Sequence, residues 1–150
     1  MEKKFVANKA VLVNPHGEIL LVRDAEKQDH THAQGKLEFP GGRMDAMETP
    51  REGLLRELQE ETRLTTDQVS VGEPLCVDLW GVGGDVQNHP VVAIFYVVRL
   101  LGENPISQSA EHSEYLWWDP RHPFPQGVLS GTERVLDAYR SREGITVAAD

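Results

Sequence analysis

The chain alternates between blocks of apolar residues and blocks of polar residues, and these blocks predict strands in its first third. Residues 5–13 and 18–23 are rich in Val, Leu and Ile, and the sequence Asn-Pro-His-Gly at residues 14–17 is typical of a turn. We therefore expect a hairpin. Residues 24–34, rich in Asp, Gln and His, are expected to form a surface loop, and residues 36–39 a short strand.

Three later apolar blocks predict strands at residues 75–80, 90–101 and 114–118. The second block is nearly continuous in Val, Ile, Phe and Tyr, which is typical of a strand buried on both faces. Residues 132–142 are predicted to form a closing helix, with Ser130 or Thr132 as its N-cap. The tail from residue 144 is expected to be frayed.

The clearest helix signal lies in the middle of the chain, at residues 50–62. Thr49 suits the N-cap, and Pro50 suits the first helical position because its φ is preset and its missing N–H is not needed there. Glu52 stands three residues after Thr49 and completes a capping box. Only Gly53 disfavours a helix over this segment.

This predicted helix has an apolar arc beside an acidic arc. At about 100° per residue, the apolar arc is formed by Leu54, Leu55 and Leu58, and the acidic arc by Glu57, Glu60 and Glu61. Like charges at this spacing repel by about 0.2–0.5 kcal/mol per pair. Mg2+ is commonly held by carboxylates together with substrate phosphates. The acidic arc is therefore a candidate magnesium site, and a solvated acidic helix face is the alternative.

The residues around this helix carry a resemblance to a known family. The segment resembles the Nudix box, in which a Gly and a Glu precede an Arg-Glu-apolar-any-Glu-Glu-any-Gly-apolar sequence. The positions in register are Gly42, Glu48, Arg56, Glu57, Leu58, Glu60, Glu61 and Leu64. The preceding residues 35–42 resemble the strand and turn that enter the box in MutT-like members.

The resemblance implies a fold and a set of site residues. The fold is the Nudix α/β/α sandwich with a mixed β-sheet, formed as one domain by residues 1–150. Glu60 and Glu61 are implied as metal ligands, joined by the backbone carbonyl of Gly41. Glu57 is implied as a further ligand or as the general base, with Arg56 orienting it.

Other residues near the box have subsidiary implied roles. Glu48 would brace the structure through hydrogen bonds or an ion pair, and Glu38 is a candidate for substrate binding. Arg63 stands where the family has Gly, and a positive φ at a non-Gly residue costs on the order of 1 kcal/mol. Arg63 is a second candidate for substrate binding, with plain surface exposure as the alternative.

A late loop offers one more catalytic carboxylate. Some family members place a Glu several residues before a strand that contains Trp, and this chain has Glu111 and Glu114 ahead of Trp117. The spacing to Trp117 favours Glu111 as the catalytic residue. Glu114 is the alternative, and either could be a solvated loop carboxylate.

Composition narrows the function classes. The net charge of −9 argues against nucleic-acid binding through a basic surface, but not against a small nucleotide held through a cation. No apolar stretch has the length of a membrane span or a signal peptide, so we expect a cytoplasmic protein. Cys76 is the only cysteine, which excludes an internal disulfide and favours a reduced core thiol. The sequence leaves the oligomeric state open, with a homodimer as one alternative.

The predicted function is Mg2+-dependent hydrolysis of a nucleoside diphosphate linked to another group, with Mn2+ as a substitute metal. Within this class the resemblance favours a nucleoside triphosphate or oxidised nucleoside triphosphate, split into a monophosphate and pyrophosphate. Residues 124–126 read Phe-Pro-Gln, without the Asn that reads oxidised guanine in MutT. The alternatives are an ADP-sugar or dinucleoside polyphosphate hydrolase and a non-catalytic Nudix module that senses a nucleotide.

Overall fold

Two long strands pair in parallel at the centre of a mixed sheet. The computed structural model describes residues 5–24, 36–80, 91–103, 106 and 112–149. Strands β1 (Phe5–Val13) and β6 (Val91–Leu100) pair in parallel from Phe5↔Val91 to Val13↔Arg99. The sheet order is β3-β2-β1-β6-β5, with β4 paired to β1 and β7 paired to β2. The remaining strands are β2 (Ile19–Asp24), β3 (Leu37–Glu38), β4 (Gly41–Arg43), β5 (Val69–Leu79) and β7 (His112–Trp118).

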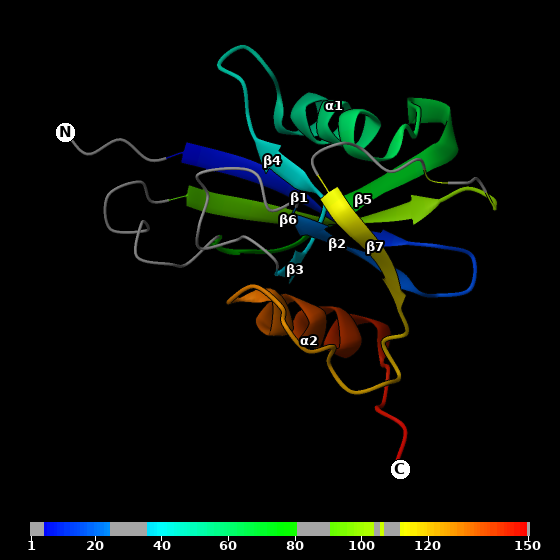
Figure 1. Cartoon of the computed structure of the whole chain (residues 1–150). Helices are drawn as coiled ribbons and strands as arrows, with labels where there is room; N and C mark the ends of the chain where they lie inside the picture. Colours follow the sequence, from blue (N-terminus) through cyan, green and yellow to red (C-terminus); the bar gives the residue numbers. More distant parts are fainter. Residues whose placement is uncertain (1–4, 25–35, 81–90, 104–105, 107–111, 150) are drawn as a thin grey trace.

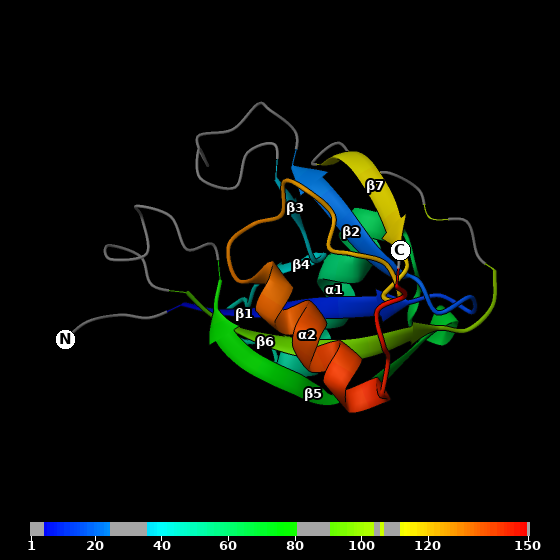
Figure 2. The same ribbon diagram turned by 90° about the horizontal axis from the view of Figure 1, so that it is seen from below.

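The sheet lies between two helices, α1 (Pro50–Thr62) and α2 (Thr132–Glu143), which cover its opposite faces (Figure 1). Figure 2 shows α2 in front of β1 and β6, with α1 behind the sheet. Each helix closes its own apolar cluster against one face of the strands. This arrangement confirms the predicted α/β/α sandwich with a mixed sheet. Over the described part of the chain, no helix is long and apolar enough to cross a membrane.

The predicted hairpin is correct only at its turn. The N–H of Gly17, which has φ +82°, donates to the carbonyl of Asn14 at 2.9 Å, and β1 and β2 pair only at Val13↔Ile19. Beyond that point β4 and β6 occupy the two edges of β1, and β2 pairs with β3 and β7 instead. The sequence pattern identifies both strands but does not identify their partners.

Strand β5 begins six residues before the predicted start at residue 75. The sequence pattern does not predict this first part as a strand because it contains Gly72 and Pro74, residue types that are normally depleted in strands. The structure accommodates them with irregular pairing to β6 between Val71 and Pro74 and between Pro74 and Cys76. Since β5 is the last strand on its side of the sheet, the missing N–H of Pro74 is tolerated there.

The prediction that β6 is buried on both faces is only half correct. Val91, Ala93, Phe95 and Val97 are buried on the α2 side of the sheet, whereas alternate residues such as Tyr96 remain partly exposed. Helix α1 packs through Leu54 and Leu58 and leaves part of that face uncovered. Cys76 is a free, partly buried thiol, and burial raises its pKa.

Helix α1 begins as the sequence predicts. The N–H of Glu52 donates to Thr49 Oγ1 at 3.3 Å, and the N–H of Thr49 donates to Glu52 Oε2 at 3.1 Å, which completes the capping box. Gly53 allows the helix to lie close to β1, since a Cβ at this position would stand 3.3 Å from Asn8 Nδ2.

Helix α2 matches the predicted residues with one added at its end, but its N-cap and the tail that follows differ from the prediction. Its N-cap is Gly131 in the left-handed region, without a side-chain hydrogen bond, so the predicted Ser130 or Thr132 cap is wrong. Thr132 is instead the first helical residue, and it is buried. The tail is not frayed, because Ile145 packs against the core cluster and the N–H of Ala148 donates to the carbonyl of Arg121 at 2.8 Å.

Candidate functional site

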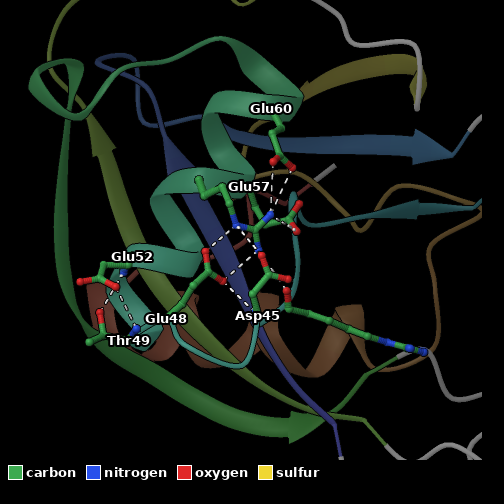
Figure 3. A network of polar contacts seen from close by, with 8 residues as sticks. Asp45, Glu48, Thr49, Glu52, Glu57 and Glu60 are labelled. Carbon is green, nitrogen blue, oxygen red and sulfur yellow. Dashed lines mark hydrogen bonds and ion pairs between the residues drawn. The ribbon is translucent and has the colours of Figure 1, made fainter.

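The acidic arc of α1 gathers around one arginine. Arg56 Nη1 donates to Glu57 Oε1 at 3.2 Å and to both oxygens of Glu60 at 3.3 Å, and Arg56 Nη2 donates to Glu48 Oε1 at 3.0 Å. Figure 3 shows the carboxylates of Asp45, Glu48, Glu57 and Glu60 turned toward the same region beside α1. Glu48 also accepts the N–H of Asp45 at 2.8 Å, so it has the bracing contacts that the sequence predicts.

The electrostatics separate these carboxyl groups into two kinds. The hydrogen bond from Arg56 lowers the pKa of Glu48, and the same bond raises the pKa of Arg56. For Glu57, desolvation outweighs the attraction of Arg56, and its pKa is raised. Glu48 is therefore a stable partner of Arg56, whereas Glu57 is a partly buried carboxyl group with an increased affinity for a proton.

Glu61 is the most deeply buried member of the acidic arc. Its exposed fraction is 4%, and its Oε2 accepts the N–H of Gly41 at 2.7 Å. Desolvation raises its pKa well above the usual value, although Lys9 and the Gly41 N–H act in the opposite direction. Glu60, by contrast, has a side chain that is 53% exposed. The three carboxylates thus share one arc of the helix but differ strongly in environment.

Two adjacent glycines bring the main chain against these carboxylates. Gly41 has φ +131°, and a Cβ there would stand 2.2 Å from the carbonyl oxygen of Asn8. A Cβ on Gly42 would stand 2.7 Å from Glu57 Oε1. A side chain at Gly41 would therefore push the turn away from β1, whereas one at Gly42 would displace the carboxylate of Glu57.

The site also contains Lys9, which the sequence analysis missed. Lys9 is fully buried on β1, and its Nζ donates to Glu38 Oε1 at 3.3 Å, to the carbonyl of Phe39 at 3.0 Å and to the carbonyl of Gly41 at 3.2 Å. It also lies 3.8 Å from the centre of the Trp80 ring. The available signal was a lysine, next to Asn8, in the middle of a strand whose other residues are apolar, where a charge is rarely buried without partners.

The other predicted site residues have different positions. Glu38 is buried in β3 and is paired with Lys9, and its Oε2 has no hydrogen-bond partner. Arg63 is exposed at the end of α1 and accepts the left-handed conformation, with φ +65°. Glu114 is exposed on β7 and contacts Arg23 Nε at 2.8 Å. Glu111 lies outside the described residues.

The donors at this site suit a hard divalent cation. The carboxylates of Glu57, Glu60 and Glu61 and the carbonyl of Gly41 offer oxygen atoms, the donor type that Mg2+ and Mn2+ prefer. In the arrangement described, Arg56 binds Glu57 and Glu60, and the Gly41 N–H binds Glu61. Accordingly, no three His, Cys, Asp or Glu side chains of the described residues form a ready metal-binding group. The role of these residues as ligands stays a prediction.

Comparison with known families identifies the class of protein that this fold and this site define. The family model described as NUDIX domain matches residues 3–139. The chain belongs to the Nudix family.

Individual relatives agree with this assignment. The chain is 38% identical to the 8-oxo-dGTP diphosphatase of Escherichia coli (strain K12) over 73 residues, 49% of this chain and 54% of that protein. It thus spans about half the length of that relative. It is 25% identical to the CTP pyrophosphohydrolase of the same organism over 136 residues, 91% of this chain and 92% of that protein.

A solved structure supports the fold independently. The MutT protein from Methanosarcina mazei Go1 has a TM-score of 0.77 to this chain at 24% identity, covering 96% of this chain and 98% of that one. The comparisons confirm the predicted MutT-like Nudix family. Nudix hydrolases act on small nucleotide substrates and generally use divalent cations. The homodimer and the cytoplasmic location stay predictions.

Proposed function

We propose that this chain is a Mg2+-dependent Nudix pyrophosphohydrolase that splits a nucleoside triphosphate, or an oxidised one, into a monophosphate and pyrophosphate. The observation that carries this proposal is the position of Glu57 and Glu61. Both carboxyl groups are withdrawn from water, both have a raised pKa, and both lie against the Gly41–Gly42 main chain. An ion pair that only stabilises the surface would not need buried carboxyl groups with a raised pKa, whereas a metal site that activates water would.

Each residue of the site has a part in the proposed chemistry. Glu60, Glu61 and the Gly41 carbonyl would hold the cation, which when bound neutralises phosphate charge and lowers the pKa of water. Glu57 is the proposed general base, because its raised pKa favours accepting a proton from the attacking water near neutral pH. Arg56 orients Glu57 through the contact of 3.2 Å.

The substrate class is proposed from the relatives and from one buried group. The two relatives are named for 8-oxo-dGTP and for CTP, which are both nucleoside triphosphates. Glu38 is a candidate substrate contact because its Oε2 is buried without a hydrogen-bond partner and could accept an N–H of a nucleobase. Arg63 is a second candidate, because its exposed guanidinium at the end of α1 could contact a phosphate. Gln126 stands where MutT has the purine-reading Asn, which argues against a strict preference for oxidised guanine.

The direct test is a substrate panel with identification of the products. Purified protein with millimolar Mg2+ is incubated with ordinary and oxidised nucleoside triphosphates, an ADP-sugar and a dinucleoside polyphosphate, and products are followed by phosphorus NMR. We expect a monophosphate and pyrophosphate from at least one triphosphate. Turnover of only the ADP-sugar or the dinucleoside would establish the alternative hydrolase. Tight binding without turnover of any compound would contradict an enzyme and favour a nucleotide sensor.

The late loop supplies a separate prediction. If Glu111 joins the metal site, Glu111→Gln should lower kcat at least tenfold with little change in KM, since the interaction is made mainly in the transition state. Glu114→Gln should be mild, because Glu114 is exposed and contacts Arg23. The reversed order in steady-state kinetics would move the role to Glu114. If both substitutions change kcat only slightly, the residues of the Nudix box carry the chemistry alone.

A further inference from the structure

The ammonium of Lys9 is fully satisfied by one short segment of main chain and one carboxylate. Its three hydrogens have three acceptors within 3.3 Å, namely Glu38 Oε1 and the carbonyls of Phe39 and Gly41. The face of Trp80 covers it at 3.8 Å. Burial of a lysine is costly unless it is paired in this manner. Lys9 therefore fixes residues 38–41, the segment that includes a proposed metal ligand.

Lys9 also acts on the carboxylates of α1. Its charge lowers the pKa of Glu61 and of Glu57, opposing the effect of burial on both groups. Arg56 acts on the same acidic arc through its contacts to Glu57 and Glu60. Two cations, the buried Lys9 of β1 and the partly exposed Arg56 of α1, thus contact oxygen atoms of the proposed site.

We propose that Lys9 is an internal counter-cation of the metal site, a positioning residue that competes with the divalent cation for the Gly41 carbonyl. This inference rests on the metal site of the proposed function. When no divalent cation is bound, Lys9 offsets the negative charge of the buried carboxylates of Glu38 and Glu61 and holds the Gly41 turn in place. Because its positive charge lies 3.2 Å from a ligand oxygen, it also weakens divalent binding. The site would therefore release its cation readily.

The test is Mn2+ affinity, measured from the electron paramagnetic resonance signal of free Mn2+. Lys9→Met should bind Mn2+ at least tenfold more tightly than the wild type. Since Lys9→Met leaves Glu38 buried and unpaired, the double variant Lys9→Met with Glu38→Gln is measured as well, and it should bind at least threefold more tightly at unchanged net charge. Arg134→Met on α2, which loses an equal charge from an exposed ion pair with Asp78, is the control and should change affinity less than twofold.

A measurement on the wild-type protein covers the case in which these variants fold poorly. The Lys9 ammonium resonance, observed by lysine-selective nitrogen NMR, should shift on addition of Mg2+ and lose its protection from solvent exchange. Unchanged or weaker Mn2+ binding in the folded variants would overturn the inference. So would a Lys9 signal that stays fixed while the Glu61 amide responds to Mg2+. Absence of Mn2+ binding to the wild type would instead contradict the proposed function itself.

Discussion

Helices α1 and α2 cover opposite faces of one sheet, and each buries a charged side chain near its last turn. In α1 the buried group is Glu61, which accepts the N–H of Gly41. Desolvation raises its pKa, and the neighbouring Glu57 and Glu38 raise it further. In α2 it is Arg140, whose Nε donates to the carbonyl of Pro120 at 2.8 Å and whose Nη2 donates to that of His122. The guanidinium of Arg140 also lies over the rings of Trp118 and Phe124.

From the difference between these two buried charges we infer a functional role for Glu61 and a structural role for Arg140. Arg140 has carbonyl acceptors and aromatic faces, so its burial stabilises the loop before α2. Burial and the neighbouring carboxylates disfavour the charged form of Glu61, and Lys9 and the Gly41 N–H act in the opposite direction without outweighing them. An added cation would relieve this cost further. We therefore propose that the residues under α1 serve binding and that those under α2 serve stability.

The largest expected effect is on turnover. Glu57→Gln and Glu61→Gln should each lower kcat at least 100-fold with the fold intact, because the change removes charge with little change of volume. Glu133→Gln, an exposed carboxylate in the first turn of α2, is the matched control and should keep full activity. Steady-state kinetics with Mg2+ measure all three variants, and wild-type turnover in both α1 variants would remove the distinction between the helices.

The next effect concerns stability on the α2 side. Arg140→Met should lower the free energy of unfolding by about 2–4 kcal/mol, because it removes two charge-assisted hydrogen bonds and two ring contacts. Urea denaturation measures this loss. Below the unfolding transition, kcat should match that of the wild type, and a large decrease in kcat of the folded protein would show that Arg140 also serves the site.

The raised pKa of Glu61 should also make the stability of the α1 side depend on pH. Its pKa is higher in the folded protein than in the unfolded chain, so the folded state binds the proton more tightly. Stability contributed by this group is therefore lost as pH rises above the unfolded value of about 4.5. We expect Glu61→Gln, measured without divalent cations, to gain melting temperature relative to the wild type as pH rises from 4.5 toward neutrality. A constant difference across that range would contradict the raised pKa.

The smallest effects distinguish the two C-caps. Both helices end in the left-handed region, α1 at Arg63 with φ +65° and α2 at Gly144 with φ +65°. Arg63→Gly should stabilise the protein by up to about 1 kcal/mol, and Gly144→Ala should destabilise it by about 1 kcal/mol. Apart from its chain neighbours, no atom of the described residues lies within 4 Å of a Cβ built on Gly144, so this cost is one of backbone strain. Thermal unfolding of both variants checks the opposite signs.

Local signals in the sequence predict most of α1 and its acidic arc. The capping box, the proline at the first position and the spacing of the leucines each depend on neighbours within one or two turns. The pairing of β1 with β4 and β6 and the burial of Lys9 were not predictable in this way. They depend on residues about 30 or more positions away in the chain, such as Glu38 and Phe95. The role of Arg140 was missed because its acceptors, the carbonyls of Pro120 and His122, also lie outside its helix, 20 and 18 positions away.

The central claim is that the acidic arc of α1 binds a divalent cation. The most direct test is Mn2+ binding, measured by electron paramagnetic resonance, to the wild type, to Glu133→Gln and to the double variant Glu60→Gln with Glu61→Gln. The account predicts that the wild type and Glu133→Gln bind Mn2+ with equal affinity, and that the double variant loses at least 100-fold. Equal affinity in all three proteins would place the cation elsewhere and contradict the account.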